Sequence, residues 1–361
     1  MIRRALVIGI ALLLVSCGTR LEDEQGGAGT GREAVRPSEP TIAYIQVGAD
    51  SIVREDRPAY LRFPGQPPVQ IGDGQQFATA GPETLLFERF DGHVQAYRIG
   101  KAATLLYERT NQGGPPRGFA FGDEIYEIQQ GRLVATDAHG ATREVSVPPA
   151  ISGAPSGCGY EKILFDAKAT TVWALTSVSS HLLAFAATPA NGAIFDLTDG
   201  RRLDLLGSGP AIAMAAGTDG KLYAITAEQK CGSHQLIVRR IDPVTMREEA
   251  AIDTHRPLGF DGIDLVGGRG GATYVHAVTA TSAELLRVDA TAVTTMPLPA
   301  DSGLLAAAAP DGAIYLFGGR ARNVVTRFDP ATNAVAQVDE ARGPDGSFIQ
   351  AVLFLDEARR P

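Results

Sequence analysis

The stretch Ala211-Ile-Ala-Met-Ala-Ala-Gly-Thr-Asp-Gly-Lys-Leu-Tyr223 decides the fold of this chain. A small, apolar run is followed by an Asp-Gly turn and then by an apolar–aromatic pair, which predicts two strands joined in a tight hairpin. The same pattern returns at Leu304-Leu-Ala-Ala-Ala-Ala-Pro-Asp-Gly-Ala-Ile-Tyr315 and, less completely, at five other places. The chain is therefore expected to be a repeat protein.

The aromatic residue of each copy marks the period of the repeat. Successive markers lie 39 to 51 residues apart, and a period of this length without helical periodicity predicts β-propeller blades. The markers are Tyr44, Phe87, Tyr126, Trp173, Tyr223, Tyr274 and Tyr315. We therefore predict an all-β fold, a seven-bladed β-propeller of four-stranded antiparallel blades.

The fifth repeat shows how four strands fit into one unit. Small residues such as Ala213 and Ala306 concentrate in the strands expected to lie innermost, where strands crowd around a central axis. No stretch after position 40 has apolar residues at helical spacing, which excludes a doubly wound α/β sheet and predicts very little helix. The strands expected in this repeat are Ala211–Ala216, Leu222–Ala227, Gln235–Ile241 and Arg247–Ile252.

The two ends of the chain are predicted to close the ring together. The segment 347–355 has the pattern of an innermost strand without a unit of its own, whereas the first unit, near Thr41, lacks its innermost strand. Pairing the two would leave no open sheet edge, so residues 41–361 are expected to form a single propeller domain. Leu182–Phe195 repeats the hairpin pattern only 22 residues after Trp173; we interpret it as the outer half of blade four, with eight blades as the alternative.

The N-terminus has the order of an export signal. Arg3 and Arg4 precede an apolar run, residues 5–15, that is too short to span a membrane. The sequence Leu14-Val15-Ser16-Cys17 resembles the lipobox of bacterial lipoproteins. The resemblance implies a signal peptide over residues 1–17, cleavage before Cys17, and attachment to the membrane through acyl chains on that cysteine.

Residues 18–40 are rich in glycine, proline and charge, which is typical of a flexible tether. In lipoproteins of this kind Gly18 after the lipidated cysteine implies the outer membrane, so the cell envelope is the expected location. Removal of residues 1–17 takes away two arginines and no acid, leaving 31 basic against 41 acidic residues, a formal net charge of −10. An acidic chain without a basic patch is not expected to bind nucleic acid.

Two cysteines remain after lipidation, Cys158 and Cys231. An even number in an exported protein favours a disulfide, and both are expected in loops on the same propeller face. A metal half-site at Cys231-Gly-Ser-His234 is the alternative, but no second half-site follows, so we predict neither a metal nor a cofactor.

The loops that lead from each outermost strand to the next innermost strand surround the channel mouth, where propellers bind ligands. Their charged residues form a ring of mixed charge, and His255 with Asp261 could act as an acid–base pair. Three further histidines, His93, His181 and His234, recur near the start of third strands. The candidate ligand-facing residues are Arg117, Glu161, His255, Arg256, Asp261, Asp301, Arg342 and Asp345.

The seventh repeat resembles a kelch repeat. It contains Ile314-Tyr-Leu-Phe-Gly-Gly319 and then Phe328-Asp-Pro-Ala-Thr-Asn-Ala-Val335, with Phe328 and Val335 where the kelch pattern has Tyr and Trp. Arg240-Ile-Asp-Pro-Val-Thr245 in the fifth repeat is similar to Arg327-Phe-Asp-Pro-Ala-Thr332. The resemblance implies the propeller fold, and proteins of this kind mostly bind partners.

Two functions remain open. The first is a lipid-anchored binding or scaffold protein of the cell envelope that presents a propeller face to a protein or polymer partner. The alternative is a lyase or hydrolase acting on a carbohydrate or peptide at the channel mouth. No nucleophile elbow, zinc-binding helix, phosphate loop or calcium loop is present, so no catalytic residue is assigned.

Overall fold

The computed structural model describes residues 41–47, 56–81, 83–110, 118–129, 132–146, 160–166, 170–176, 181–205, 211–217, 219–230, 233–257, 262–267, 272–278, 283–289, 292–299, 302–303, 305–318, 324–340 and 348–355. They belong to one compact unit, Glu39–Pro361. Every regular element in these segments is a β-strand. Within them, no helix has the length and hydropathy needed to cross a membrane. The expected signal peptide and tether, residues 1–40, lie outside the described residues.

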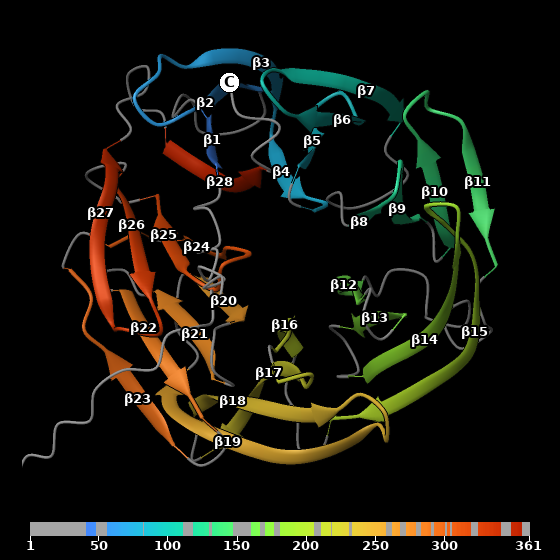
Figure 1. Ribbon diagram of the computed structural model, residues 1–361. Helices are drawn as coiled ribbons and strands as arrows, with labels where there is room; N and C mark the ends of the chain where they lie inside the picture. Colours follow the sequence, from blue (N-terminus) through green and yellow to red (C-terminus); the bar gives the residue numbers. More distant parts are fainter. Residues whose placement is uncertain are drawn as a thin grey trace, which may run out of the picture. The chain divides into compact units, whose positions relative to one another are not determined.

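The strands form seven antiparallel sheets of four strands each, arranged around a central axis (Figure 1). The predicted seven-bladed propeller is thereby confirmed. Blade four contains Leu182–Phe195 in its third and fourth strands, β14 (His181–Ala190) and β15 (Ala193–Asp204). This segment is the outer half of a blade, as interpreted from the sequence, and does not begin an eighth blade.

Six blades are continuous in the chain, and each runs in sequence order from the axis outward. Blade two has β4 (Gln76–Thr79), β5 (Thr84–Glu88), β6 (His93–Ile99) and β7 (Ala103–Thr110). Blade three has β8 (Gly118–Phe121), β9 (Glu124–Gln129), β10 (Arg132–Asp137) and β11 (Thr142–Val145). Blade four begins with β12 (Tyr160–Asp166) and β13 (Thr171–Thr176).

The remaining three continuous blades follow the same plan. Blade five has β16 (Ala211–Ala216), β17 (Leu222–Lys230), β18 (Ser233–Asp242) and β19 (Arg247–Pro257). Blade six has β20 (Gly262–Gly267), β21 (Thr273–Val278), β22 (Ala283–Val288) and β23 (Val293–Met296). Blade seven has β24 (Leu305–Ala308), β25 (Ile314–Phe317), β26 (Val324–Asp329) and β27 (Ala334–Glu340).

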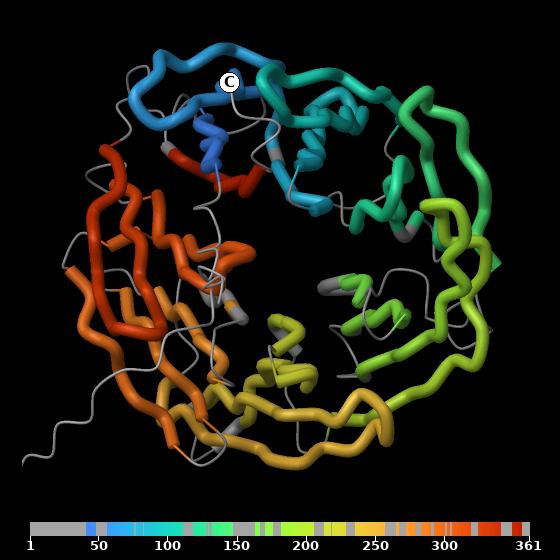
Figure 2. Tube along the Cα trace, in the orientation of Figure 1, coloured from blue at the N-terminus to red at the C-terminus, as the bar shows by residue number. Residues whose placement is uncertain are grey.

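Blade one is assembled from both ends of the chain, as predicted. Its innermost strand is β28 (Phe348–Leu355), which pairs along its length with β1 (Thr41–Val47). The outer strands β2 (Arg57–Arg62) and β3 (Val69–Gly74) complete the sheet. Figure 2 shows β28, in red, beside β1, in blue, so the ring is closed by hydrogen bonds between segments that are far apart in the sequence.

The seven aromatic markers occupy equivalent places in the ring. Each lies on the second strand of its blade and is almost completely buried. The apolar clusters lie between neighbouring blades; one joins Tyr223 of blade five to Val275 of blade six, and another joins Tyr274 of blade six to Phe328 of blade seven. The cluster between blades seven and one contains two markers, Tyr44 and Tyr315, and the cluster between blades two and three contains none. The repeat seen in the sequence therefore marks the second strand of each blade, which packs against a neighbouring blade.

The seam between blades three and four is additionally closed by backbone contacts. The long β14–β15 hairpin of blade four reaches blade three, where Gly192 contacts Gly122 and the Leu197 N–H donates to the Ser146 carbonyl at 3.2 Å. Both glycines have positive φ, and any Cβ on Gly122 would meet the Gly192 backbone. Glycine is thus required at this close approach.

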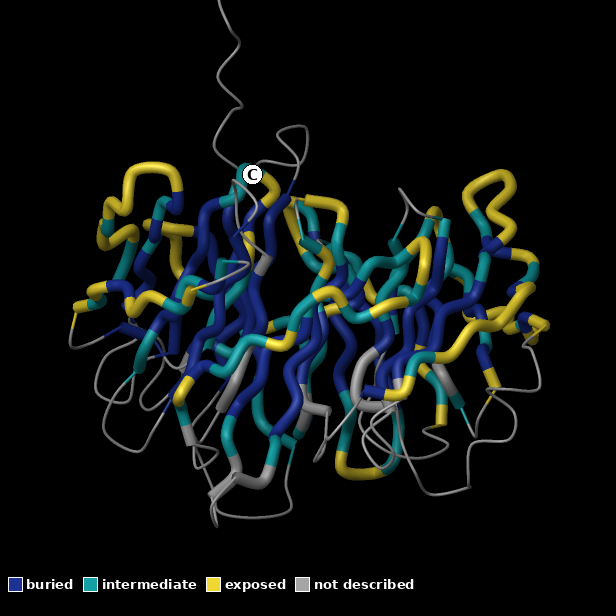
Figure 3. The backbone as a smooth tube through the Cα atoms, turned by 90° about the horizontal axis from the view of Figure 1, so that it is seen from below, coloured by how far each residue is buried: buried dark blue, intermediate teal, exposed yellow. Residues whose placement is uncertain are grey.

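The propeller has two different faces. The turn face carries the turns between first and second strands and between third and fourth strands, for example Asp219–Gly220 and Val244–Met246. The connection face carries the second-to-third connections, such as Arg89–Gly92, and the links from one blade to the next. Figure 3 shows buried residues along the inner strands of the blades and exposed residues both in the turns and on the outermost strands, so side chains available to a ligand lie on the two faces and on the outer side of the ring.

Substitution of Gly122 tests the seam, with Gly220 as a matched control. Both glycines lie in first-to-second-strand turns with φ of +61° and +75°, but nothing lies within 4 Å of a Cβ placed on Gly220. Gly220→Ala should therefore lower the free energy of unfolding by only the left-handed backbone cost, about 1–2 kcal/mol. Gly122→Ala should cost at least about 1 kcal/mol more, measured by urea denaturation. Equal losses would contradict a tight seam.

Candidate functional site

The structure describes only part of the predicted channel-mouth ring. Glu161 lies in β12 and His255 and Arg256 lie in β19, so the prediction that these three are loop residues was wrong. Outside the described residues lie Arg117, Asp261, Asp301, Arg342 and Asp345, together with Cys17, Cys158 and Cys231. The side chain of Glu161 is not described either. His255 and Arg256 are therefore the two predicted residues whose side chains can be placed.

Arg256 connects blade five to blade six through hydrogen bonds. Its Nε donates to Glu284 Oε2 at 2.6 Å, and its Nη2 donates to Thr295 Oγ1 at 3.0 Å, both in blade six. The guanidinium therefore extends from the outermost strand of blade five to the next blade. This contact also explains why β19 runs on to Pro257, beyond the predicted end at Ile252, because a paired Arg256 holds the strand in place.

His255 is presented to solvent on the connection face. Its side chain is 80% exposed, and its backbone has φ of +54°, a region that few residues other than glycine adopt. The residue before it is fixed, because the hydroxyl of buried Thr254 donates to the Leu236 carbonyl at 2.8 Å. The residues on either side of His255 are bound to other strands, Thr254 to β18 and Arg256 to β22, so the backbone directs the imidazole outward.

The carboxylate beside His255 is Asp253. Asp253 Oδ1 accepts the His255 backbone N–H at 2.8 Å and lies 3.5 Å from His255 Nδ1. With its amide nitrogen toward Asp253, Gln235 donates to both carboxylate oxygens, at 3.3 and 3.0 Å. A carboxylate facing Nδ1 leaves Nε2 directed elsewhere, which is the arrangement used to orient a histidine for proton transfer. The expected partner, Asp261, lies outside the described residues.

A second braced group lies on the connection face of blade two. In the loop between β5 and β6, Phe90 is 55% exposed, and its backbone N–H donates to Asp56 Oδ1 of blade one at 2.6 Å. Arg89 lies 3.4 Å from both Asp56 and Asp91. His93, at the start of third strand β6 as predicted, places Nδ1 3.0 Å from Asp91 Oδ1. The exposed phenyl ring therefore belongs to a loop whose backbone is bound by Asp56 of the neighbouring blade.

The electrostatics of this loop favour the charged form of Asp91. Partial desolvation raises the pKa of Asp91, but the hydrogen bonds from His93 and the charge of Arg89 outweigh it, so the pKa is lower than its ordinary value. Asp91 is therefore ionised at neutral pH, where it can pair with Arg89 and accept hydrogen bonds from His93.

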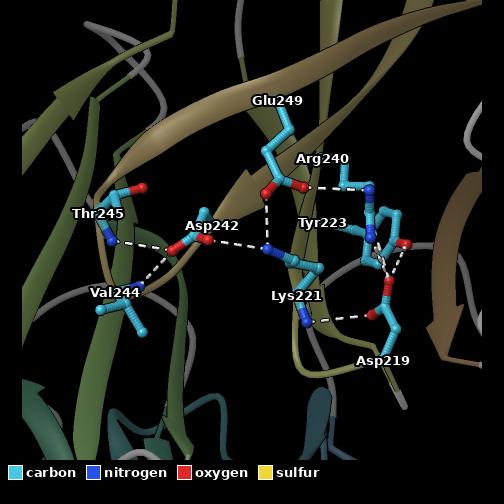
Figure 4. Close-up of polar contacts among 8 residues, drawn as sticks. All are labelled: Asp219, Lys221, Tyr223, Arg240, Asp242, Val244, Thr245 and Glu249. Carbon is cyan, nitrogen blue, oxygen red and sulfur yellow. Dashed lines mark hydrogen bonds and ion pairs between the residues drawn. The ribbon is translucent and has the colours of Figure 1, made fainter.

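On the turn face of blade five the charged side chains are paired with one another (Figure 4). Lys221 Nζ contacts Asp242 at 2.8 Å and Glu249 at 2.6 Å. Arg240 contacts Glu249 and Asp219, both at 3.1 Å. The carboxyl group of Asp219 also accepts the hydroxyl of the marker Tyr223 at 2.9 Å.

Blade seven has the same pairing between a third-strand arginine and an aspartate of the first turn. Arg327 donates to Asp311 at 3.1 Å, and Arg327 lies directly opposite the marker Tyr315. Asp329 Oδ1 accepts the Ala331 N–H at 2.9 Å, as Asp242 Oδ1 accepts the Val244 N–H at 2.8 Å. The similar Arg-x-Asp-Pro sequences of blades five and seven therefore have a structural reason: the Arg pairs with the first turn of its blade, and the Asp caps the last turn.

Two arginines, the buried Arg239 and the partly buried Arg109, pair with glutamates. Arg109 of blade two forms a two-point contact with Glu127 of blade three, with Nε at 3.0 Å and Nη2 at 2.5 Å. Arg239, only 2% exposed, pairs with Glu228 and with Glu248 at 2.5 Å, and its Nε donates to the Thr226 hydroxyl at 2.9 Å. These pairs are internal, so they stabilise the blades and are not available to a ligand.

The described residues contain no group of three or more His, Cys, Asp or Glu side chains that could hold a metal ion. Sequence reasoning selected His255 and Arg256 but missed Phe90, Asp56 and Asp253. The two braced histidines share the pattern Asp-x-His, at residues 91–93 and 253–255, and a third copy at 137–139 makes the same contact in the turn between β10 and β11. The pattern predicts this contact, because an Asp two residues before a His can accept its backbone N–H, but it does not single out the connection face.

Comparison with known proteins supports the fold. Neither a protein-family model nor a curated protein matches the sequence. Among solved structures, the chain is similar to a candidate 6-phosphogluconolactonase from Bacteroides fragilis, with 14% identity over 89% of this chain and 99% of the other and a TM-score of 0.59.

Two further solved structures show the same likeness. Apo AztD from Citrobacter koseri has 14% identity and a TM-score of 0.55 over 87% of this chain and 98% of the other. The periplasmic gluconolactonase of Pseudomonas aeruginosa has 13% identity and a TM-score of 0.51 over 88% and 99%. At these identities the likeness establishes the β-propeller fold alone.

The buried position of Arg239 predicts a large stability effect. Arg239→Leu would leave the Glu228 and Glu248 carboxylates without their buried cation, which should lower the free energy of unfolding by about 3–5 kcal/mol. Arg132 offers the control, since it too is a third-strand arginine paired with a fourth-strand glutamate, Glu144, but is 67% exposed. Arg132→Leu should cost less than about 1 kcal/mol in the same denaturant titration. A small effect of both substitutions would contradict the structural role of Arg239.

The turn-face network predicts how stability depends on pH. The hydrogen bond from Lys221, with those from the Thr245 and Val244 N–H groups, holds the pKa of Asp242 below its ordinary value of 3.8. As the pH falls, the unfolded chain takes up this proton first, so the contribution of Asp242 to stability is present above about pH 4 and is lost below it. Asp242→Asn keeps an acceptor for the turn but removes the charge. Between about pH 6 and pH 3 the Tm of the wild type should therefore fall further than that of the variant, and parallel curves would contradict the role of the charge.

Proposed function

We propose that this chain is a lipid-anchored binding or scaffold protein of the bacterial cell envelope that presents its propeller to a protein or polymer partner. The resemblance of Leu14–Cys17 to a lipobox supports the anchor. A propeller of the same fold from Pseudomonas aeruginosa is described as periplasmic, which agrees with export.

The connection face is the observation that carries the proposal. It presents two exposed and locally braced side chains, Phe90 on blade two and His255 on blade five. Blades three and four separate them on one side of the ring, and blades six, seven and one separate them on the other. Contact points this widely spaced suit a partner that covers a broad surface, because a small ligand could not reach both.

Cross-linking in native cells tests the proposal. The full-length lipoprotein should be found in the membrane fraction, and mild cross-linking, detergent extraction and affinity purification should recover one partner in near-stoichiometric amount. Cys17→Ser removes the acylated thiol, so this variant should leave the membrane fraction. A wild-type protein recovered alone, or a Cys17→Ser variant that stays fully membrane-bound, would contradict the proposal.

The geometry of His255 favours a second candidate, a hydrolase with its site on the connection face. Gln235, Asp253 and His255 form a chain of polar contacts that orients the imidazole, and two similar propellers carry gluconolactonase in their names. In such an enzyme His255 Nε2 would accept a proton from the water that attacks the lactone carbonyl.

A lactone hydrolysis assay with purified protein tests this candidate. If His255 is the general base, His255→Ala should lower kcat by about 100-fold or more, and Asp253→Asn should lower it to a lesser extent. Phe90→Ala, on the opposite part of the ring, should leave the rate unchanged. Absence of hydrolysis by the wild type, or equal rates for wild type and His255→Ala, would exclude the candidate.

A further inference from the structure

The seam between blades seven and one, where the two ends of the chain close the ring, brings three polar side chains together. Tyr44 and Arg62 lie directly opposite each other on β1 and β2, so both point to the same side of blade one. Asp339 of β27 lies opposite Val325, which belongs with Tyr44 to the apolar cluster between the two blades. Arg62 Nη2 approaches Asp339 Oδ2 across this seam, at 3.8 Å.

These polar groups are buried, and their direct contacts are incomplete. Tyr44 is fully buried, and the side chains of Arg62 and Asp339 are 10% and 17% exposed. Asp339 Oδ1 accepts the Glu340 N–H at 2.8 Å, but among the described residues nothing forms a hydrogen bond with Asp339 Oδ2 or with the Tyr44 hydroxyl. The Arg62–Asp339 contact is also too long for a hydrogen bond. Because a buried hydroxyl and a buried carboxylate oxygen need partners, a further group is expected between them.

Other blades show what occupies the equivalent place. In blade five Asp219 accepts the hydroxyl of Tyr223 at 2.9 Å and lies 3.1 Å from the guanidinium of Arg240. In blade seven Arg327 donates to Asp311 at 3.1 Å. Both aspartates belong to the turn between the first and second strands. Blade one has no such turn, because its first two strands, β28 and β1, come from opposite ends of the chain.

The charges at the seam determine which kind of group can bridge it. The guanidinium of Arg62 can only donate hydrogen bonds and a carboxylate such as that of Asp339 can only accept them, so the bridging group must do both. A cation would be repelled by Arg62, and an anion would be repelled by Asp339. The buried position requires a small group. Water meets all of these conditions, and it commonly bridges polar contacts longer than about 3.5 Å.

We propose that the seam binds an internal water molecule that accepts hydrogen bonds from the Tyr44 hydroxyl and the Arg62 guanidinium and donates one to Asp339 Oδ2. The water takes the place of the first-turn aspartate and completes the polar contacts where the ring is closed. Burial, followed by the nearby Asp339 carboxylate, raises the pKa of Tyr44, so its hydroxyl keeps the proton that it donates. The inference concerns the closure of the ring and depends neither on the membrane anchor nor on a partner.

A crystal structure of the wild-type chain, at a resolution that shows ordered water, tests the site directly. One water should lie about 2.6–3.2 Å from both Tyr44 Oη and Asp339 Oδ2. Blade five provides the control, because Tyr223 and Asp219 should be in direct contact there without water between them. A direct hydrogen bond from Tyr44 or Arg62 to Asp339 Oδ2, or another side chain in the place of the water, would overturn the inference.

Tyr44→Phe tests the same site in solution, with Tyr223→Phe as the matched control. Both tyrosines are buried, and both substitutions remove only a hydroxyl group. If water binds the Tyr44 hydroxyl, each variant should melt about 1–3 °C below the wild type, because each loses a buried hydrogen bond. Removal of a hydroxyl that has no partner would instead leave the Tm unchanged or raise it. A Tyr44→Phe variant that melts at or above the Tm of the wild type would therefore overturn the inference, and the proposed function would be unaffected.

Discussion

The pairing of β28 with β1 is the constraint on which the rest of the ring depends. β28 supplies buried residues to two interfaces, with Leu353 and Leu355 toward blade two and Val352 and Phe354 toward blade seven. Because every blade buries its apolar faces only against its neighbours, release of this one strand would expose two interfaces at once. The entropic cost of bringing the chain ends together is modest even for a long chain, since it grows only with the logarithm of its length.

Two arrangements of arginine residues recur around this closed ring. In blades one, five, six and seven the marker tyrosine lies directly opposite an arginine of the third strand; the pairs are Tyr44–Arg62, Tyr223–Arg240, Tyr274–Arg287 and Tyr315–Arg327. Blades two, three and four have Gln95, Ala135 and Ala184 at that place. In blades two and three an arginine of the outermost strand contacts the next blade instead: Arg109 reaches Glu127, and Arg143 donates to the Ile194 carbonyl at 2.5 Å. Blade five has both arrangements, because its Arg256 also binds Glu284 of blade six.

The fold could be predicted from the sequence because its signal is local. Each marker aromatic sits in a short unit whose strands pair with their neighbours in the chain, so the period of the markers could be converted into blades without knowledge of distant contacts. The candidate site depends instead on contacts that no pattern within one blade reports. β19 continues through His255 because Arg256 binds Glu284 of blade six. Phe90 was missed because an aromatic residue in a sequence is expected in a core, and its exposure follows from the contact of its backbone with Asp56 of blade one.

The two faces differ in whether their side chains stabilise the blades. This difference explains how such a ring can keep its fold while its function varies. On the turn face, Asp219, Asp242 and Glu249 are bound by cationic side chains of the same blade, and a substitution there disturbs the hairpins themselves. On the connection face, Phe90 and His255 project from braced backbone and support no neighbouring blade, so their side chains can change at little cost in stability. Functional differences between this chain and propellers that share about 14% of its sequence are therefore expected to concentrate on the connection face.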